Sequence, residues 1–415
     1  MEASDRIERP YSGQVADRSG TVEGVRRANL ARVLQFAHFE RALSRSRLTA
    51  LTGLNRSTVA DLVAELTSLG LTVERAPDPS RRVGRPSPVV APDPRVIAIA
   101  ANPEVDALTM AAVGLDGGIP ARRRIDVDHL MSPEEAARLI AEVTDEWRGT
   151  TLRDARIVAA GVAVPGLVRA ADGLVRIAPH LDWRDAPVRT LVEEATGLPT
   201  AVGNDASLGA IAEHLFGAGR GIDDLVYLNG GASGIGGGLI VHGIPVGGTA
   251  GYAGEFGQNR PGILSPADRR AADGVLEDEV SRARLLAAVG LSAADEPTLA
   301  AAIFASEAPD VAAELSRQRR ILATALANAV NVLNPAVVVL GGFLATIAES
   351  DPAALDESVR AQCMPASAED LEIRTAVLAE DRLLIGAAEA AFGDLLRDPM
   401  AGDAAGGQVR AATAS

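Results

Sequence analysis

The stretch that decides the fold of the first part of the chain is SRSRLTALTGLNRSTVADLVAELTSLGL, residues 44–71. Ser44 is placed to cap a short helix over residues 45–51 that Gly53 ends, because serine accepts a hydrogen bond from a free backbone N–H and glycine closes a helix in the left-handed conformation. Asn55 can cap a second helix. One face of that helix carries an apolar stripe of Val59, Leu62, Val63, Leu66 and Leu69. Two short helices joined by a glycine-containing turn predict a helix-turn-helix.

The segments on both sides extend this pair to a larger module. Residues 25–39 predict a preceding helix with one apolar face, and residues 71–75 and 87–90 predict two strands. A strand, a basic turn and a second strand behind a helix-turn-helix are typical of a wing. We therefore expect residues 21–92 to form a winged helix-turn-helix, with a disordered arm over residues 1–20. The turn between the two strands carries Arg81, Arg82 and Arg85.

The charge of the chain is divided between two parts. The 415 residues carry a net charge of −15, and all 40 cationic side chains are arginine because the sequence contains no lysine. Residues 1–95 hold 15 arginines against 11 acidic residues, a local charge of +4, which leaves −19 for residues 96–415. A chain that is acidic throughout would repel phosphate, but this distribution leaves the N-terminal part suited to an anionic partner.

The residues that would contact DNA follow from the geometry of a helix-turn-helix. The first residues of its second helix point into the major groove, where arginine binds guanine or phosphate and small polar side chains reach phosphates or base edges. Here they are Asn55, Arg56, Ser57 and Thr58. Candidate phosphate contacts are Arg26, Arg27 and Arg45, and the wing arginines Arg81, Arg82 and Arg85 are further candidate DNA-binding residues. The alternative is a small helical bundle whose Ser and Thr only cap helices, but the basic wing and the separated charge favour double-stranded DNA as a partner.

Cysteine content and hydropathy narrow the environment of the protein. Cys363 is the only cysteine, which excludes an intramolecular disulfide and a thiolate zinc site. No apolar run approaches the roughly 20 residues that span a bilayer, and the polar start of the sequence is not a signal peptide. We therefore expect a cytoplasmic bacterial protein with no membrane partner.

Beyond residue 92 the sequence alternates strands with helices. Strands are predicted by apolar, β-branched runs over residues 96–101, 108–113, 157–164, 225–228 and 337–340. Helices are predicted over residues 133–147, 206–216 and 317–333. Such alternation with glycine-rich turns is typical of an α/β domain, here over residues 96–396, and is compatible with two lobes and a cleft. Residues 398–415 are small and rich in Gly and Ala, and we expect them to fray.

One of the motifs between these elements pairs an amide with a carboxylate. GNDAS, residues 203–207, places Asn204 and Asp205 at the end of a strand, where they can hold a sugar hydroxyl from two sides and the carboxylate can accept its proton. The alternative is that Asp205 only caps the helix that follows.

Two further motifs are rich in glycine. NGGASGIGGGLIV, residues 229–241, suits either close approach to a phosphate or a tight hairpin. GGTAGYAGEFGQ, residues 247–258, puts Glu255 between glycines, as an acceptor for a polyhydroxylated ligand or as an exposed loop carboxylate.

The order of the motifs resembles the ROK family of sugar kinases and repressors. The resemblance covers residues 96–396 and rests on GVAVPG, GNDAS, SGIGGG, AGEFGQ, GVLE, NPAVVVLGG and LLIGAAEAA, in that order between residues 161 and 391. With the N-terminal module and its GRP-bearing wing, the chain resembles a ROK transcriptional regulator. The resemblance implies an α/β fold in which a winged helix-turn-helix precedes a two-lobed actin-like ATPase domain of the ribonuclease H-like kind, with a sugar in its cleft.

The resemblance also implies roles for five residues. In the family an Asn-Asp pair binds sugar, and its Asp is the catalytic base in kinases; these positions are Asn204 and Asp205 here. The Glu and His of the family's ExGH pattern and the Glu of its GCxE pattern also touch sugar. They correspond to Glu255, Gln258 and Glu277.

Two departures from the family pattern predict that the chain is not an enzyme. The DxGGT loop that holds ATP phosphates in family kinases reads AANPEVD at residues 100–106, and phosphoryl transfer depends on positioning and charge stabilisation at those phosphates. The family's zinc site also lacks its ligands, because Gln258 replaces the His and no cysteine lies between Gly257 and Glu277. We expect no metal and no cofactor, and the loss of zinc leaves the position of Glu277 open.

The leading functional hypothesis is a DNA-binding repressor of sugar-utilisation genes that senses a sugar or a sugar derivative in an inactive kinase-like domain. We expect a homodimer or a higher homo-oligomer. One alternative is an active ROK sugar kinase with a fused DNA-binding domain. Another is a ligand-independent regulator that uses the ROK domain as a dimerisation scaffold.

Overall fold

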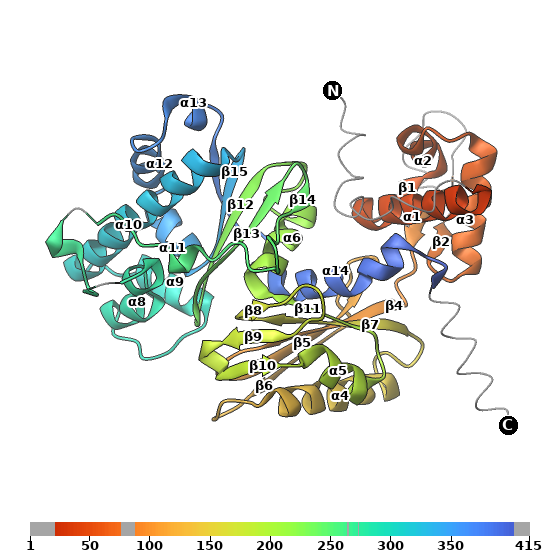
Figure 1. Cartoon of the computed structure of the whole chain (residues 1–415), viewed down its shortest axis with the longest axis horizontal. Helices are drawn as coiled ribbons and strands as arrows, with labels where there is room; N and C mark the ends of the chain where they lie inside the picture. The colour runs from red at the N-terminus through yellow and green to blue at the C-terminus, as the bar shows by residue number, and fades with distance from the viewer. Residues whose placement is uncertain (1–20, 76–87, 264, 273, 402–415) are drawn as a thin grey trace. The chain divides into compact units, whose positions relative to one another are not determined.

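The computed structural model describes residues 21–75, 88–263, 265–272 and 274–401, and it divides into two compact units (Figure 1). Unit 1 contains the described residues of Met1–Ala163, Ala186–Val202 and Ala387–Ser415. Unit 2 contains those of Val164–Asp185 and Gly203–Gly386. The expected N-terminal arm lies outside the described residues, and the expected C-terminal tail is described only as far as residue 401.

Three helices form the N-terminal module, residues 21–92, within unit 1. They are α1 (Val22–Glu40), α2 (Arg45–Thr52) and α3 (Arg56–Ser68). The predicted caps are confirmed: the side chains of Ser44 and Asn55 accept hydrogen bonds from the N–H groups of Arg47 and Thr58, and Gly53 ends α2 with φ of 69°. The predicted apolar stripe of α3 is buried as far as Leu66, whereas Leu69 caps the helix and is half-buried.

A small sheet completes this module. Its strands are β1 (Leu43–Ser44), β2 (Thr72–Arg75) and β3 (Val89–Pro92), and β3 pairs antiparallel with both others. The two predicted strands are confirmed as a pair, although the second begins two residues later than expected. The sequence did not indicate β1, because two residues are too few to form a pattern. The turn that carries Arg81, Arg82 and Arg85 lies outside the described residues.

Unit 1 also contains a five-stranded mixed sheet, in the order β11-β7-β4-β5-β6, except for the last residues of β7 and β11, which belong to unit 2. All residues of β4 are buried, which matches its continuous apolar sequence; β4 pairs antiparallel with β5 and parallel with β7. Helices α4 (Pro133–Gly149) and α5 (Val188–Thr196) pack against each other. The strands are β4 (Val96–Pro103), β5 (Ala107–Gly114), β6 (Ala121–Asp126), β7 (Arg156–Val164) and β11 (Thr200–Asn204).

A buried polar contact joins α1 to the C-terminal helix α14 (Arg382–Arg397) inside unit 1. The His38 ring is fully buried, with Nδ1 2.6 Å from the carbonyl oxygen of Leu115 and Nε2 2.9 Å from a carboxylate oxygen of Glu389. Because a carbonyl oxygen only accepts, Nδ1 is the donor in the first contact. The Gln35 side chain adds a hydrogen bond of 2.9 Å to the carbonyl oxygen of Leu396.

A second five-stranded sheet lies in unit 2, in the order β14-β13-β12-β15-β16. Strands β12 and β13 form a hairpin in which Gly231 pairs with Gly234, so the glycine-rich segment at residues 229–241 has the hairpin conformation that was one of its two interpretations. Strand β12 also pairs parallel with β15, which pairs parallel with β16. The strands are β12 (Leu225–Gly231), β13 (Gly234–Val241), β14 (Ile244–Pro245), β15 (Val337–Gly342) and β16 (Glu372–Thr375).

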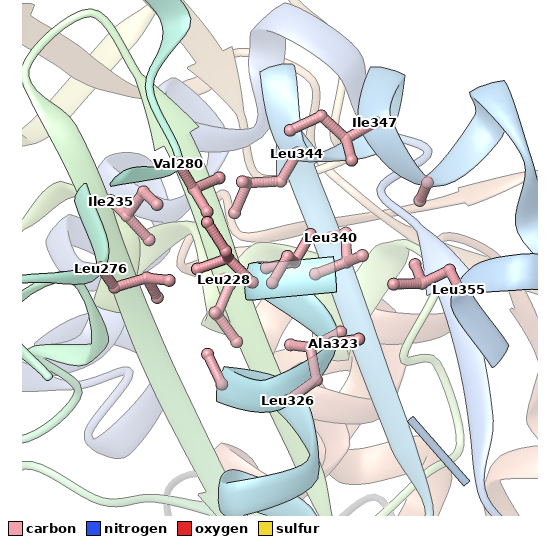
Figure 2. Close-up of a cluster of buried hydrophobic side chains, with 14 of the residues drawn as sticks. Leu228, Ile235, Leu276, Val280, Ala323, Leu326, Leu340, Leu344, Ile347 and Leu355 are labelled. Atoms are coloured by element: carbon pink, nitrogen blue, oxygen red, sulfur yellow. The ribbon is translucent and has the colours of Figure 1, made fainter. Parts of the chain in front are cut away.

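Helices cover this sheet around an apolar core. Figure 2 shows that Leu228 and Leu340 of the sheet meet Leu326 of a long helix and Leu276 of a short one. The long helix, α10, begins at Pro309, eight residues before the predicted start at residue 317. Proline is well suited to the first position of a helix, because the N–H that it lacks would have no partner within the helix. The helices are α6 (Asp205–Phe216), α7 (Leu276–Glu279), α8 (Arg282–Ala288), α9 (Glu296–Phe304), α10 (Pro309–Leu333), α11 (Phe343–Ser350), α12 (Pro352–Arg360) and α13 (Pro365–Ala368).

A smaller, three-stranded sheet has the order β10-β9-β8. Its strands are β8 (Leu167–Val168), β9 (Val175–Ala178) and β10 (Trp183–Ala186). In the part of the chain that the structure describes, no helix is both long and apolar enough to cross a membrane.

Removing the Glu389 carboxylate tests the contact between α1 and α14. We expect Glu389→Ala to lower the free energy of unfolding by about 1–3 kcal/mol, because the buried Nε2 of His38 loses its partner. Urea denaturation followed by circular dichroism measures this change. Asp394→Ala is the matched control, because Asp394 is an exposed acid on the same helix and its removal should change stability by less than about 0.5 kcal/mol. Equal losses in the two variants would contradict the structural role of Glu389.

Candidate functional site

A cavity of about 340 Å³ lies within unit 2 and is the candidate ligand site. This volume falls in the range of small-molecule sites. The five residues predicted to contact sugar all line it: Asn204, Asp205, Glu255, Gln258 and Glu277. They come from segments as far apart in the sequence as residues 204 and 277, so the fold brings them together. The wall also contains Gly166, His180, Asn229, Ser233 and Gly234.

Asn204 and Asp205 stand at the junction of β11 and α6. The Oδ1 atom of Asn204 accepts a hydrogen bond of 2.9 Å from the N–H of Ser207, so Asn204 is the residue that caps α6. The alternative interpretation assigned the cap to Asp205 and is wrong, since Asp205 is the first residue of the helix. Its Oδ1 accepts from the N–H of Ala206 at 2.8 Å and from Nδ2 of Asn204 at 3.2 Å. The pair is therefore fixed by backbone contacts while both residues line the cavity.

Glu277 is held at the cavity by two donors. Nε2 of Gln258 donates a hydrogen bond of 2.6 Å to Oε1, and the N–H of Ile235 donates one of 3.2 Å to Oε2. The neighbouring Gly234 has φ of +121°, and a Cβ atom there would overlap Oε2 of Glu277. Glycine at this end of the β12–β13 hairpin thus gives the carboxylate its place.

The cavity wall has a negative electrostatic character. Asp205, Glu255 and Glu277 all line it, and no arginine is present among its described lining residues. Solvent reaches part of the Glu255 side chain, but the surrounding protein raises the pKa of this carboxyl group, and the charge of Glu277 raises it further.

Sequence reasoning missed three polar residues of the wall, His180, Ser233 and Asn229, and of these Asn229 is the buried one. It is 4% exposed, and its Oδ1 accepts hydrogen bonds from the Tyr227 hydroxyl at 3.2 Å and from Nε of Arg382 at 3.0 Å. Burial raises the pKa of Tyr227, so this hydroxyl stays a neutral donor. Arg382 also binds the Glu296 carboxylate at 2.9 Å. Asn229 is the first residue of the glycine-rich motif, but the sequence did not indicate its contacts. Arg382 is distant in sequence, and Tyr227 lies within a strand that was predicted from its apolar residues.

The residues predicted to contact DNA lie on the N-terminal module. Asn55, Arg56 and Ser57 are exposed at the start of α3, and Thr58 is half-buried. Three predicted phosphate contacts are engaged in ion pairs: Arg45 with Glu74 at 2.6 Å, Arg26 with Glu65 at 2.9 Å and Arg27 with Asp398 at 3.6 Å.

The segment at residues 100–106, where the resemblance would place the family's phosphate loop, is mostly strand. Strand β4 continues through Asn102 and Pro103, beyond the predicted end at residue 101, and Pro103 pairs with Leu108 of β5. Asn102 is buried, and its Nδ2 donates a hydrogen bond of 2.9 Å to the carbonyl oxygen of Ala163. Within the described residues, no group of three or more His, Cys, Asp or Glu side chains is arranged to hold a metal ion.

Comparison with known proteins places these observations in a family. The model of the ROK family matches residues 105–392. Over 407 residues the chain is 25% identical to the xylose repressor of Caldicellulosiruptor bescii, and the match covers 90% of this chain and 98% of the repressor. Over 257 residues it is 30% identical to a glucokinase of Halalkalibacterium halodurans, and this match covers 55% of this chain and 74% of the kinase.

Solved structures show the same fold. A ROK family transcriptional regulator, described as a homologue of the E. coli MLC protein, matches with a TM-score of 0.71 at 22% identity over 90% of this chain and 97% of the regulator. A ROK hexokinase from Thermus thermophilus matches with a TM-score of 0.55 at 24% identity over 72% of this chain and 99% of the hexokinase. The chain therefore has the α/β sugar-kinase-like fold with mixed sheets, and the resemblance drawn from its motifs is confirmed: the protein belongs to the ROK family.

Proposed function

We propose that the protein is a sequence-specific DNA-binding regulator, a repressor of sugar-utilisation genes, whose DNA affinity depends on a sugar bound in the unit 2 cavity. The observation that carries the proposal is that Asn204, Asp205, Glu255, Gln258 and Glu277 line one cavity. The similarity to a xylose repressor over nearly its whole length supports the regulatory role.

The N-terminal module is proposed to be the DNA-binding part. The order of helices α2 and α3 and a three-stranded sheet supports a winged helix-turn-helix, and Asn55, Arg56 and Ser57 are exposed at the start of α3, which would read the major groove in such a fold. The wing arginines Arg81, Arg82 and Arg85 are proposed to contact phosphates. A homodimer would present two such modules to two half-sites of an operator.

The chemistry of the cavity wall favours a neutral sugar. Carboxylates and amides suit hydroxyl groups, because a carboxylate accepts hydrogen bonds and an amide both donates and accepts them. Three carboxylates without an arginine among the described lining residues would repel a sugar phosphate or a sugar acid. The sugar is proposed to bind one arrangement of the protein better than another and so to shift the population that binds DNA.

The main alternative is an active sugar kinase, and one observation favours it: Asp205, at the position of the family's catalytic base, lines the cavity. The segment at residues 100–106 argues against it, because it has no glycine and continues a strand through Asn102 and Pro103. A kinase would release ADP in the presence of its sugar and would lose that activity on Asp205→Asn. A ligand-independent scaffold would bind no sugar in any form.

Arg56→Ala tests the DNA-binding surface. We expect weaker binding to the chain's own upstream DNA by about 1–3 kcal/mol with relaxed specificity if Arg56 reads a base, or a salt dependence with a slope lower by about 1 if it contacts a phosphate. Gel retardation across a salt series measures both quantities. Arg138→Ala, an exposed arginine on α4, should leave binding unchanged. No retardation of upstream DNA by the wild-type protein at low salt would refute DNA binding.

Glu277→Gln tests the sugar site. Calorimetric titration of the wild-type protein with xylose, glucose and other neutral sugars should identify a ligand, and the variant should bind that ligand at least about tenfold more weakly, because a carboxylate gives stronger hydrogen bonds to hydroxyls than an amide. Glu142→Gln on the exposed face of α4 is the control. Tighter binding of a sugar phosphate than of the free sugar would contradict the proposed ligand class.

Glu255→Gln gives a pH-dependent prediction. The raised pKa of Glu255 means that its ionisation reduces stability as the pH rises from the ordinary glutamate value through the higher folded value. We therefore expect the Tm of Glu255→Gln to exceed that of the wild-type protein at about pH 7 and the difference to vanish at about pH 3, below the ordinary glutamate pKa, where the carboxyl is protonated in both states. Thermal unfolding over this range measures the difference. A constant difference would show that ionisation of Glu255 is not its cause.

A further inference from the structure

The segment that carries Glu277 is anchored on its other side by a buried acid. Helix α7 is a single turn, Leu276–Glu279. Leu276 and the following Val280 are buried in the apolar core, Glu277 lines the cavity, and Glu279 is 1% exposed. The carboxylates of Glu277 and Glu279 therefore lie in different environments, although both are on one turn of helix: the first lines the cavity and the second is buried.

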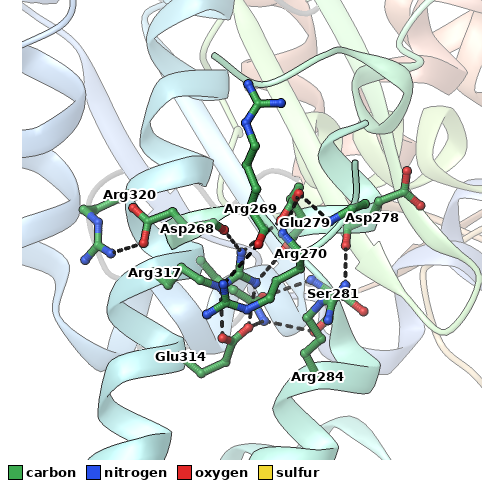
Figure 3. A network of polar contacts seen from close by, with 12 residues as sticks. Asp268, Arg269, Arg270, Asp278, Glu279, Ser281, Arg284, Glu314, Arg317 and Arg320 are labelled. Atoms are coloured by element: carbon green, nitrogen blue, oxygen red, sulfur yellow. Dashed lines mark hydrogen bonds and ion pairs between the residues drawn. The ribbon is translucent and has the colours of Figure 1, made fainter. Parts of the chain in front are cut away.

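Glu279 is held by Arg317 of α10 and by the backbone of the preceding loop (Figure 3). Nη1 of Arg317 lies 3.1 Å from Oε2 of Glu279. The N–H groups of Arg270 and Ala271 donate hydrogen bonds of 3.0 Å to the same carboxylate. The buried carboxylate thus has both a cationic partner and two backbone donors, which offset the free-energy cost of removing it from water.

Arg317 uses all five of its N–H donors. Besides the Glu279 carboxylate, Nη1 donates to the carbonyl oxygen of Asp268 at 2.9 Å and Nη2 to that of Glu279 at 2.7 Å. Nη2 and Nε donate to the two carboxylate oxygens of Glu314 at 2.7 and 2.9 Å. Burial would raise the pKa of Glu314, but hydrogen bonds from Arg317 and Gln318 outweigh that effect and lower it. Arg317 therefore joins α10 to both ends of the segment at residues 268–279.

Neighbouring contacts fix the same segment. Gln318, one residue along α10, accepts from the N–H of Ser281 at 3.0 Å and donates to its carbonyl oxygen at 3.2 Å. The N–H of Leu276 donates to the carbonyl oxygen of Asn259 at 2.8 Å, which ties α7 to the residue next to Gln258. The path from Arg317 to the cavity is consequently short and continuous: Arg317 to Glu279, Glu279 to Glu277 along one turn, and Glu277 to Gln258.

We propose that Arg317 and Glu279 are positioning residues of the ligand site, which lock α7 so that Glu277 and Gln258 present their polar atoms to a sugar. The inference rests on the proposed function. Neither residue lines the cavity, so each acts through Glu277 and not by contact with the ligand. A lysine at position 317 has three donors on one atom and cannot span Glu314, Glu279 and the carbonyl oxygen of Asp268 together.

The test uses the full-length protein with Arg317→Met, Arg317→Lys and Glu279→Gln. The first readout is the Kd of the neutral sugar that binds the wild-type protein. We expect it to rise at least tenfold in Arg317→Met and by less in the two conservative variants. The second readout is trypsin cleavage after Arg269 or Arg270, which we expect to be at least tenfold faster in Arg317→Met because the loop loses its anchor. DNA affinity without sugar should stay within twofold of wild type.

Arg319→Met is the matched control, because Arg319 lies on the same helix and pairs with Asp351, away from the loop. It should leave both readouts unchanged. Folded Arg317→Met and Glu279→Gln proteins that bind the sugar as tightly as the wild type, even with lower Tm values, would overturn the positioning role and leave a merely structural one. If Arg317→Met does not fold, Glu279→Gln decides the question by the same criterion. A wild-type protein that binds no sugar would instead refute the proposed function. In that case, unchanged trypsin cleavage in Arg317→Met would also refute the role of Arg317 as the anchor of the loop.

Discussion

The candidate site depends on the requirement that a buried carboxylate be fully partnered. Glu279 can lie in the protein interior because Arg317 balances its charge and the N–H groups of Arg270 and Ala271 complete its hydrogen bonds. With Glu279 fixed, the single turn of α7 directs Glu277 into the cavity. Removal of Arg317 would leave the Glu279 carboxylate without its cationic partner, so this one interaction links the polar network to the geometry of the site.

Local sequence signals predicted local structure well. Ser44, Gly53 and Asn55 act within a few residues of their positions, so both ends of α2 and the start of α3 could be placed from caps, whereas α1 was predicted from the spacing of its apolar residues. Contacts between distant residues could not be predicted in this way. His38 and Glu389 are 351 residues apart, and no periodic pattern connects them. The choice between Asn204 and Asp205 as the cap of α6 was also beyond the sequence, because both residue types cap helices.

The roles of the five candidate sugar contacts came from the family resemblance. From residue types alone, Asp205 could equally be a helix cap and Glu255 an exposed loop carboxylate. Their common cavity adds what the motifs lacked, namely proximity. Its wall is acidic, whereas the exposed start of α3 carries Arg56, and this difference follows the division of charge along the sequence. A neutral sugar and an anionic duplex are the ligands that these two surfaces favour. Strand β4 continues through Asn102 and Pro103. This feature favours the proposed regulator over the alternative of a kinase that would use the same cavity.

The most direct measurement is a titration of upstream operator DNA with wild-type protein and with Glu277→Gln, each with and without the neutral sugar that binds. We predict that the sugar changes the DNA affinity of the wild-type protein by about tenfold, within the range of ordinary allosteric coupling, and that Glu277→Gln shows little of this change at the same sugar concentration. A sugar effect of the same size in both proteins, or none in the wild type, would contradict a sugar-dependent regulator that acts through this cavity.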